Sequence, residues 1–147
     1  SIGFDVATFG IFAAVYVGAC LSVVPSDIRL NMTELNEYYI SQGIKHTVMT
    51  TQVAKLFIDH IDETSLDVLL TGGEKLGEFR GPDEFTLIDV YGPTESFMFT
   101  NTVVVNEKID YSSVGFLNYN VKAYILDAEG RRVPFGAVGE LYLSSAL

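Results

Sequence analysis

A hydroxyl and a carboxylate follow directly after one apolar run, in the stretch Tyr91 to Glu95, which reads YGPTE. The run itself, Phe85 to Val90, is closed by Gly-Pro and is typical of a buried strand that ends in a sharp turn. In open α/β sheets, ligands bind beyond the carboxyl ends of the strands. Thr94 can donate there to a phosphate, and Glu95 can hold Mg²⁺ through a hard oxygen. The alternative is an ordinary turn in which Thr94 caps the next helix and Glu95 is solvated.

The elements that must position these side chains alternate between helix and strand up to Glu95. Such alternation predicts α/β architecture with a flavodoxin-like parallel sheet flanked by helices. Asn31, followed by Glu34, predicts a capped helix start, and Gly43 predicts its end. The expected helices are Asp5 to about Val17, Met32 to about Gln42, Thr51 to about Ile61, and one after Gly73. The expected strands are Cys20 to Val24, Lys45 to Met49, Leu66 to Thr71 and Phe85 to Val90.

Past Glu95 the pattern changes to strands separated by turns, with little helix. The strands expected there are Thr102 to Val105, Val121 to Asp127 and Val138 to Leu143. The pattern and the length predict a single unit over residues 1–147, with an α/β portion, residues 1–100, and a β-rich tail, residues 101–147.

Composition excludes several classes of function. The net charge of −10 argues against nucleic acid or an anionic membrane as a partner. The longest apolar run, Gly10 to Val24, is shorter than the roughly 20 residues that a membrane span needs. The single cysteine, Cys20, excludes an internal disulfide and fits a reducing, cytoplasmic compartment. His46 and His60 do not have the spacing to form a metal site with it.

Four motifs share their order and spacing with a known family. They read FDVATF at Phe4 to Phe9, LLTGGE at Leu69 to Glu74, YGPTE, and GAVGELYL at Gly136 to Leu143. Together they resemble the adenylation domains of nonribosomal peptide synthetases, which belong to the adenylate-forming enzymes. The resemblance covers essentially all 147 residues and implies an excised substrate-specificity subdomain. Complete domains of this family use ATP and Mg²⁺ to convert an amino acid to an aminoacyl adenylate and pyrophosphate, and they serve a carrier protein.

The resemblance implies that this unit is a subdomain and that its α/β portion, residues 1–100, carries an amino-acid pocket. Asp5 matches the acidic residue that binds the substrate's ammonium group; its alternative role is a helix N-cap. The other matching positions are all apolar, which implies a hydrophobic amino acid, and a branched aliphatic one because Gly72 leaves room that Val6 and Phe9 reduce. Without the resemblance these residues would be interpreted as plain core. The substrate-binding positions are Asp5, Val6, Phe9, Val48, Leu70, Gly72, Val90, Met98 and Phe99.

The resemblance also assigns a nucleotide site. Tyr91 matches the ring that stacks on adenine, and Asp89 stands where relatives usually carry Asn. Thr94 would bind the α-phosphate and Glu95 the Mg²⁺. Backbone groups would border the nucleotide at the remaining positions, which are Gly73, Glu74 and Gly92.

Other groups that the family needs for catalysis are not found in these residues. They are a Ser/Thr/Gly-rich phosphate loop, an aspartate for the ribose hydroxyls and a lysine that contacts the reacting carboxylate. We therefore expect the isolated chain to be inactive and to hold no tightly bound cofactor, with the remaining lobes of the domain as partners. Two alternatives stay open: a non-catalytic flavodoxin-like binding or interaction module, and an acyl- or aryl-acid activator of the same superfamily.

Overall fold

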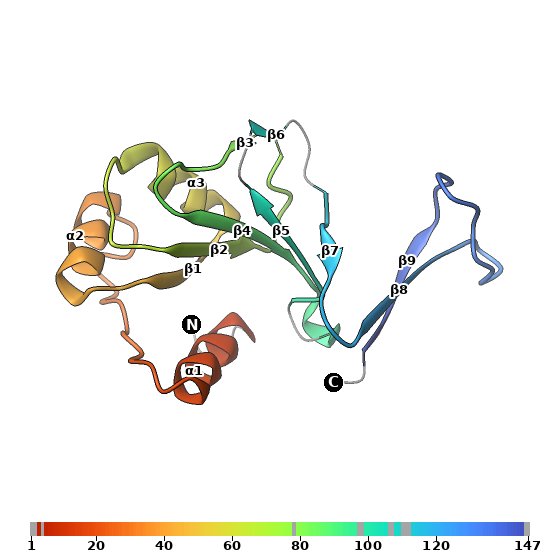
Figure 1. Ribbon diagram of the computed structural model, residues 1–147, viewed down its shortest axis with the longest axis horizontal. Helices are drawn as coiled ribbons and strands as arrows, with labels where there is room; N and C mark the ends of the chain where they lie inside the picture. Colours follow the sequence, from red (N-terminus) through yellow and green to blue (C-terminus); the bar gives the residue numbers. More distant parts are fainter. Residues whose placement is uncertain are drawn as a thin grey trace.

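A five-stranded mixed sheet forms the centre of the computed structural model, with strand order β1-β2-β4-β5-β7 (Figure 1). The structure describes residues 3, 5–77, 79–96, 99–105, 108–109 and 113–145. Two further pairs of strands, β3 with β6 and β8 with β9, lie outside this sheet. The strands are β1 (His46–Thr50), β2 (Val68–Gly72), β3 (Phe79–Arg80), β4 (Thr86–Tyr91), β5 (Asn101–Val105), β6 (Lys108–Ile109), β7 (Phe116–Leu117), β8 (Val121–Leu126) and β9 (Glu140–Ser145).

Helices precede and follow β1, as the sequence predicts. They are α1 (Asp5–Tyr16), α2 (Met32–Gln42), α3 (Thr51–His60) and the 3₁₀ turn η1 (Thr94–Ser96). The predicted cap of α2 is confirmed, because Asn31 Oδ1 accepts a hydrogen bond from Glu34 N at 3.3 Å. Gly43 ends α2 with φ +62°, in the left-handed region that favours glycine. No helix in the described part of the chain has the length and apolarity needed to cross a membrane.

The sheet confirms the predicted α/β class but is parallel in only part of its width. β1, β2 and β4 run parallel, whereas β5 and β7 are antiparallel to their neighbours. The antiparallel half begins where the chain leaves strand–helix alternation, since short connections can join only antiparallel neighbours. The register places Val48, Leu70 and Ile88 side by side across the three parallel strands.

One face of the sheet carries the hydrophobic core. Phe57 of α3, Leu69 of β2 and Leu87 of β4 are essentially inaccessible to solvent. Apolar residues of α2 pack into the same cluster, so α2 and α3 cover this face. Val48, Leu70 and Ile88 alternate with the core residues and therefore point to the opposite face, where they are only half-buried. In Figure 1, α3 lies above the sheet and α1 below it.

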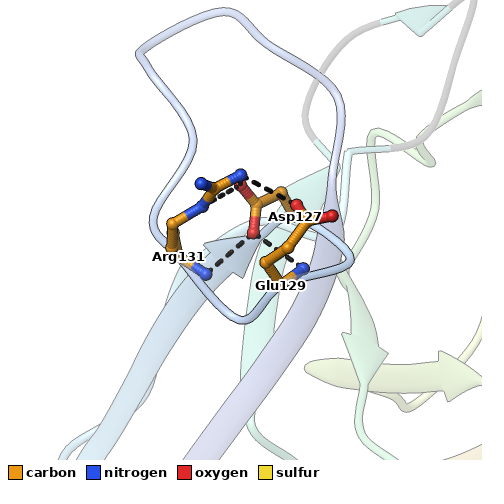
Figure 2. A network of polar contacts seen from close by, with 3 residues as sticks. All are labelled: Asp127, Glu129 and Arg131. Atoms are coloured by element: carbon orange, nitrogen blue, oxygen red, sulfur yellow. Dashed lines mark hydrogen bonds and ion pairs between the residues drawn. The ribbon is translucent and has the colours of Figure 1, made fainter.

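The β8–β9 hairpin projects away from the sheet (Figure 1). An exposed polar network orders the turn that follows β8, as Figure 2 shows. Asp127 Oδ1 accepts from the backbone N–H groups of Glu129 and Arg131 at 3.0 and 2.8 Å, and Arg131 Nε donates to Asp127 Oδ2 at 2.9 Å. The hydrogen bond from the Arg131 backbone is the main reason that the pKa of Asp127 lies below its usual value.

Two predicted elements are wrong. Residues 20–24 form no strand, because they run beside α2, where Tyr38 binds Ser22 and the Val23 carbonyl through its hydroxyl, and Cys20 is exposed. The helix expected after Gly73 is also absent from the described residues between it and β3. The chain bends at Gly73 and Glu74 instead, and polar contacts from α3 hold Glu74 there.

Candidate functional site

The predicted pocket residues of the sheet share one face. Gly72 ends β2 beside Val90 of β4, and Leu70 lies two residues earlier on the same face. Val48 of β1 is the register partner of Leu70. These four positions therefore form one apolar surface near the carboxyl ends of the parallel strands, where ligands bind in open α/β sheets.

Gly72 is required by the approach of two strands. A Cβ atom at this position would lie 2.5 Å from the backbone oxygen of Val90 and 2.8 Å from its Cγ2 atom. The glycine therefore lets β2 and β4 come together, in addition to any room that it leaves for a substrate.

Replacing Gly72 with Ala is expected to lower the free energy of unfolding by about 1–3 kcal/mol, because a backbone atom blocks the new methyl group. Urea unfolding of the 147-residue chain measures the change. Gly10→Ala in α1 is the matched control, since a Cβ there meets nothing within 4 Å. That control should stabilise the chain by about 0.5–1 kcal/mol through helix propensity. A Gly72→Ala chain as stable as the unchanged one would contradict the close approach.

Helix α1 brings the first motif to the turn after β4. Asp5 Oδ2 accepts a hydrogen bond from Thr94 Oγ1 at 2.8 Å, and Asp5 Oδ1 accepts from Val6 N at 2.8 Å. The rings of Phe9 and Phe99 meet edge to face, with centroids 4.6 Å apart and planes at 82°. The side chain of Val6 is half-buried. Met98, the remaining predicted pocket position, lies outside the described residues.

The two predicted nucleotide residues of β4 differ in their exposure to solvent. Asp89 lies beside Thr71 on the core face and is only 8% exposed. This burial raises the pKa of the Asp89 carboxyl to about 6, although the Val90 N–H partly opposes the shift. Tyr91, by contrast, is 41% exposed and can present its ring to a ligand.

The turn segments beyond the strands carry the other nucleotide positions. Gly73 adopts φ +95°, a conformation that other residues rarely reach, and Glu74 follows it on the surface. Gly92 is half-buried between β4 and η1, while Thr94 and Glu95 are exposed in η1. The described residues contain no cluster of three His, Cys, Asp or Glu side chains for a metal ion. The exposed Glu95 carboxylate has the oxygen chemistry that suits Mg²⁺, with phosphates as the remaining ligands.

Several supporting residues escaped sequence analysis. Thr51 is fully buried and donates through Oγ1 to the Glu74 carbonyl at 3.2 Å, while Gln52 Nε2 donates to Glu74 Oε2 at 3.0 Å. Both residues open α3 directly after β1, so the rule that ligands lie beyond strand ends could have identified them. Asn118 Nδ2 donates to the Phe99 carbonyl at 2.6 Å. No pattern in the sequence connects these last two residues.

Two surface hollows lie elsewhere. One, of about 760 Å³, lies along β8 and the loop 132–137. The other, of about 440 Å³, is lined by Asp67 and residues 82–86. Neither is lined by a residue predicted to contact the amino acid or the nucleotide, so the apolar surface of Val48, Leu70 and Val90 stays the candidate site.

Comparisons with known proteins agree with the motifs. The model of the family described as AMP-binding enzyme matches residues 1–147. Surfactin synthase subunit 2 of Bacillus subtilis (strain 168) is 38% identical over 141 residues, which are 95% of this chain and 4% of that protein. The chain thus spans only a few per cent of the length of such relatives.

Solved structures share the fold. A nonribosomal peptide synthetase (NRPS) protein containing adenylation and PCP domains, PA1221, superposes with a TM-score of 0.83 at 24% identity, over 99% of this chain and 32% of that one. The synthetase FmoA3, in its form with bound α-methyl-L-serine-AMP, gives a TM-score of 0.86 at 18% identity, over 100% of this chain and 18% of that one.

Proposed function

The chain belongs to the AMP-binding enzyme family, and on that premise we propose that it is the part of a nonribosomal peptide synthetase adenylation domain that selects a hydrophobic amino acid. The observation that carries this proposal is the meeting of α1 with the turn after β4. Asp5 and Thr94, from motifs 89 residues apart, are joined by one hydrogen bond. Asp5 would accept a hydrogen bond from the ammonium group of the amino acid, and Thr94 beside it would donate one to a phosphate of ATP. The activation of an amino acid with ATP requires both substrates to bind side by side in this way.

The apolar lining supports a hydrophobic substrate. Val48, Leu70 and Val90 lie on one sheet face, and the Phe9–Phe99 ring pair lies in the segments that Asp5 and Thr94 join. An apolar site cannot favour a polar side chain by pairing with it. We propose a branched aliphatic amino acid, because the two packed rings reduce the space for a large aromatic one.

The nucleotide roles follow the edge of the sheet. Tyr91 would stack on adenine beside Asp89, and the backbone of Gly73, Glu74 and Gly92 would border the nucleotide. Thr94 would donate to the α-phosphate. ATP supplies the adenylyl group, and Mg²⁺, held by Glu95, would offset phosphate charge.

Exposed apolar side chains on α1 suggest that other parts of the same synthetase pack against this helix. No residue of α1 is fully buried, and Phe12 and Tyr16 of this helix are 67% and 91% exposed. Large exposed apolar side chains such as these are typical of an interaction site when they gather in a patch. We propose that the remaining lobes of the adenylation domain cover it and supply the missing catalytic groups, that the 147-residue chain alone does not catalyse adenylation, and that the complete cytoplasmic enzyme serves a carrier protein.

A graft tests the proposed function. Residues 1–147 replace the matching segment of a well-behaved adenylation domain, and ATP–pyrophosphate exchange is measured against a panel of amino acids. A preference that moves to a branched aliphatic amino acid supports the pocket assignment. A folded hybrid that keeps the preference of its host would show that the pocket positions are wrong, and a non-catalytic scaffold role would then gain support.

A further inference from the structure

One hydrogen bond joins two residues that would bind different substrates under the proposed function: Asp5 would bind the amino acid, and Thr94 would bind ATP. Thr94 Oγ1 donates to Asp5 Oδ2 at 2.8 Å, and this contact connects the start of η1 with the start of α1. Thr94 is exposed and Asp5 is only partly buried, so ligands can reach both side chains. The contact therefore lies where an amino acid and a nucleotide would meet.

The chemistry of the Thr94 hydroxyl makes this contact compete with phosphate binding. A threonine hydroxyl has a single hydrogen, so Thr94 cannot donate to Asp5 and to a phosphate oxygen at the same time. Asp5 Oδ1 already accepts from Val6 N, which leaves Oδ2 as the oxygen that Thr94 occupies. An ammonium group forms a stronger, charge-assisted hydrogen bond to a carboxylate than a neutral hydroxyl does. Asp5 Oδ2 has room for a second donor, but an ammonium there shares the charge of the oxygen with Thr94 and weakens their hydrogen bond. An amino acid can therefore loosen Thr94 from Asp5.

We propose that the Asp5–Thr94 hydrogen bond is a latch that couples amino-acid binding to nucleotide binding, an inference that rests on the proposed function. The structure shows the latch in its closed form, with the hydrogen bond made. A phosphate that takes the Thr94 hydrogen leaves Asp5 Oδ2 without this donor, and the ammonium replaces it. An ammonium that binds Asp5 releases the Thr94 hydroxyl for the phosphate. Each ligand removes a cost of binding the other, and such coupling is reciprocal.

A second contact keeps the two segments together when the latch opens. The Phe9 ring of α1 packs against the Phe99 ring, with the centroids 4.6 Å apart. This apolar contact does not depend on the protonation or the partner of Asp5. The latch can therefore open by rotation of the Thr94 hydroxyl, with α1 still attached beside the turn.

Equilibrium binding to the complete adenylation domain that contains residues 1–147 tests the latch. The nucleotide probe is an ATP analogue with a methylene bridge between the α- and β-phosphorus atoms, so that no adenylate forms. The amino acid is the one with the highest exchange rate, and its des-amino carboxylic acid is the control ligand. The amino acid should lower the Kd of the analogue about fivefold. This factor is at the low end of the range for coupled sites, because solvent reaches the Asp5–Thr94 hydrogen bond. The des-amino acid carries no ammonium and should have no such effect.

Variants of Thr94 give a readout that a purely structural contact would not give. Thr94→Val removes the hydroxyl and keeps the shape of the side chain. Measured without nucleotide, the amino acid should bind this variant about fivefold more tightly, because no hydroxyl competes for Asp5 Oδ2, and the coupling should disappear. Thr94→Ser keeps the hydroxyl and should keep the coupling.

Each possible outcome decides the question. Equal coupling by the amino acid and by its des-amino analogue would overturn the latch, and so would unchanged or weaker amino-acid binding by Thr94→Val. Absence of amino-acid binding by the unchanged domain would sink the proposed function instead, so the two failures are distinguishable. The ligand comparison needs no variant and decides the matter even where Thr94→Val does not fold.

Discussion

Replacing Asp5 with Asn is expected to lower kcat/KM for the amino acid about 100-fold in the complete adenylation domain that contains this chain. Asp5 begins α1, and its carboxylate lies against Thr94 at the candidate site. Loss of a hydrogen bond between charged groups costs about 1.5–3 kcal/mol, and 2.7 kcal/mol corresponds to about 100-fold in rate. Asparagine keeps an Oδ1 acceptor for the Val6 N–H, so the folding of α1 should be preserved. ATP–pyrophosphate exchange at varied amino-acid concentrations measures the effect.

The control for Asp5→Asn is Asp27→Asn, which removes an exposed carboxylate from the turn before α2. It should leave kcat/KM within about twofold of the unchanged domain, as expected of surface substitutions. If Asp5→Asn behaves like this control, Asp5 does not bind an ammonium group. The alternative of an acyl- or aryl-acid activator, whose substrates carry no ammonium, would then gain support.

Sequence alone predicted the elements that have strong local signals. Asn31 and Gly43 bound α2 as expected, since a side-chain cap and a left-handed glycine act within a few residues. The strand at Cys20 to Val24 was wrong because strand formation needs a partner, and this segment lies beside α2 instead. The antiparallel direction of β5 and β7 was not predicted either, because direction is set by pairing across the sheet and not by local composition.

The candidate site was likewise predictable only in part from the sequence. The family motifs assigned Asp5 to an amino-acid pocket and Thr94 to a nucleotide site, and the family match confirms the resemblance on which both assignments rest. The direct bond between them and the support of Phe99 by Asn118 depend on contacts 89 and 19 residues apart in the chain. Such distant contacts have no periodicity or spacing signal. The strand contact that requires glycine at position 72 likewise appears only when β2 and β4 lie side by side.

Asp89→Asn is expected to stabilise the 147-residue chain against unfolding. The gain should appear only at pH values at which the aspartate would be ionised. Burial raises the pKa of Asp89 from 3.8 to about 6, so the folded chain binds this proton more tightly than the unfolded chain. As the pH rises from about 4 to above 6, the unchanged chain loses stability, because the unfolded state gives up the proton first. A pKa of about 6 in the folded chain in place of 3.8 corresponds to about 3 kcal/mol at most. Asparagine carries no charge at any pH and avoids this loss.

The surroundings of Asp89 suit an amide. The Val90 N–H that now donates to the carboxylate can donate to the amide oxygen. The neighbouring Thr71 Oγ1 is buried and has no hydrogen-bond partner among the described residues, so it can accept from an amide donor. An asparagine therefore keeps an oxygen that accepts from the Val90 N–H, and it adds an N–H donor beside Thr71 Oγ1. An ionised carboxylate has no hydrogen to donate to that oxygen.

Urea unfolding at pH 8 and at pH 4 measures this prediction. The gain from Asp89→Asn should approach about 3 kcal/mol at pH 8 and fall towards zero at pH 4, where the folded aspartate is protonated. Asp59→Asn, on the exposed surface of α3, should change stability by no more than about 0.5 kcal/mol at either pH. An equal gain at both pH values would mean that the amide stabilises the chain by its hydrogen bonds alone. The cost of the ionised carboxylate on the core face would then be ruled out as the cause.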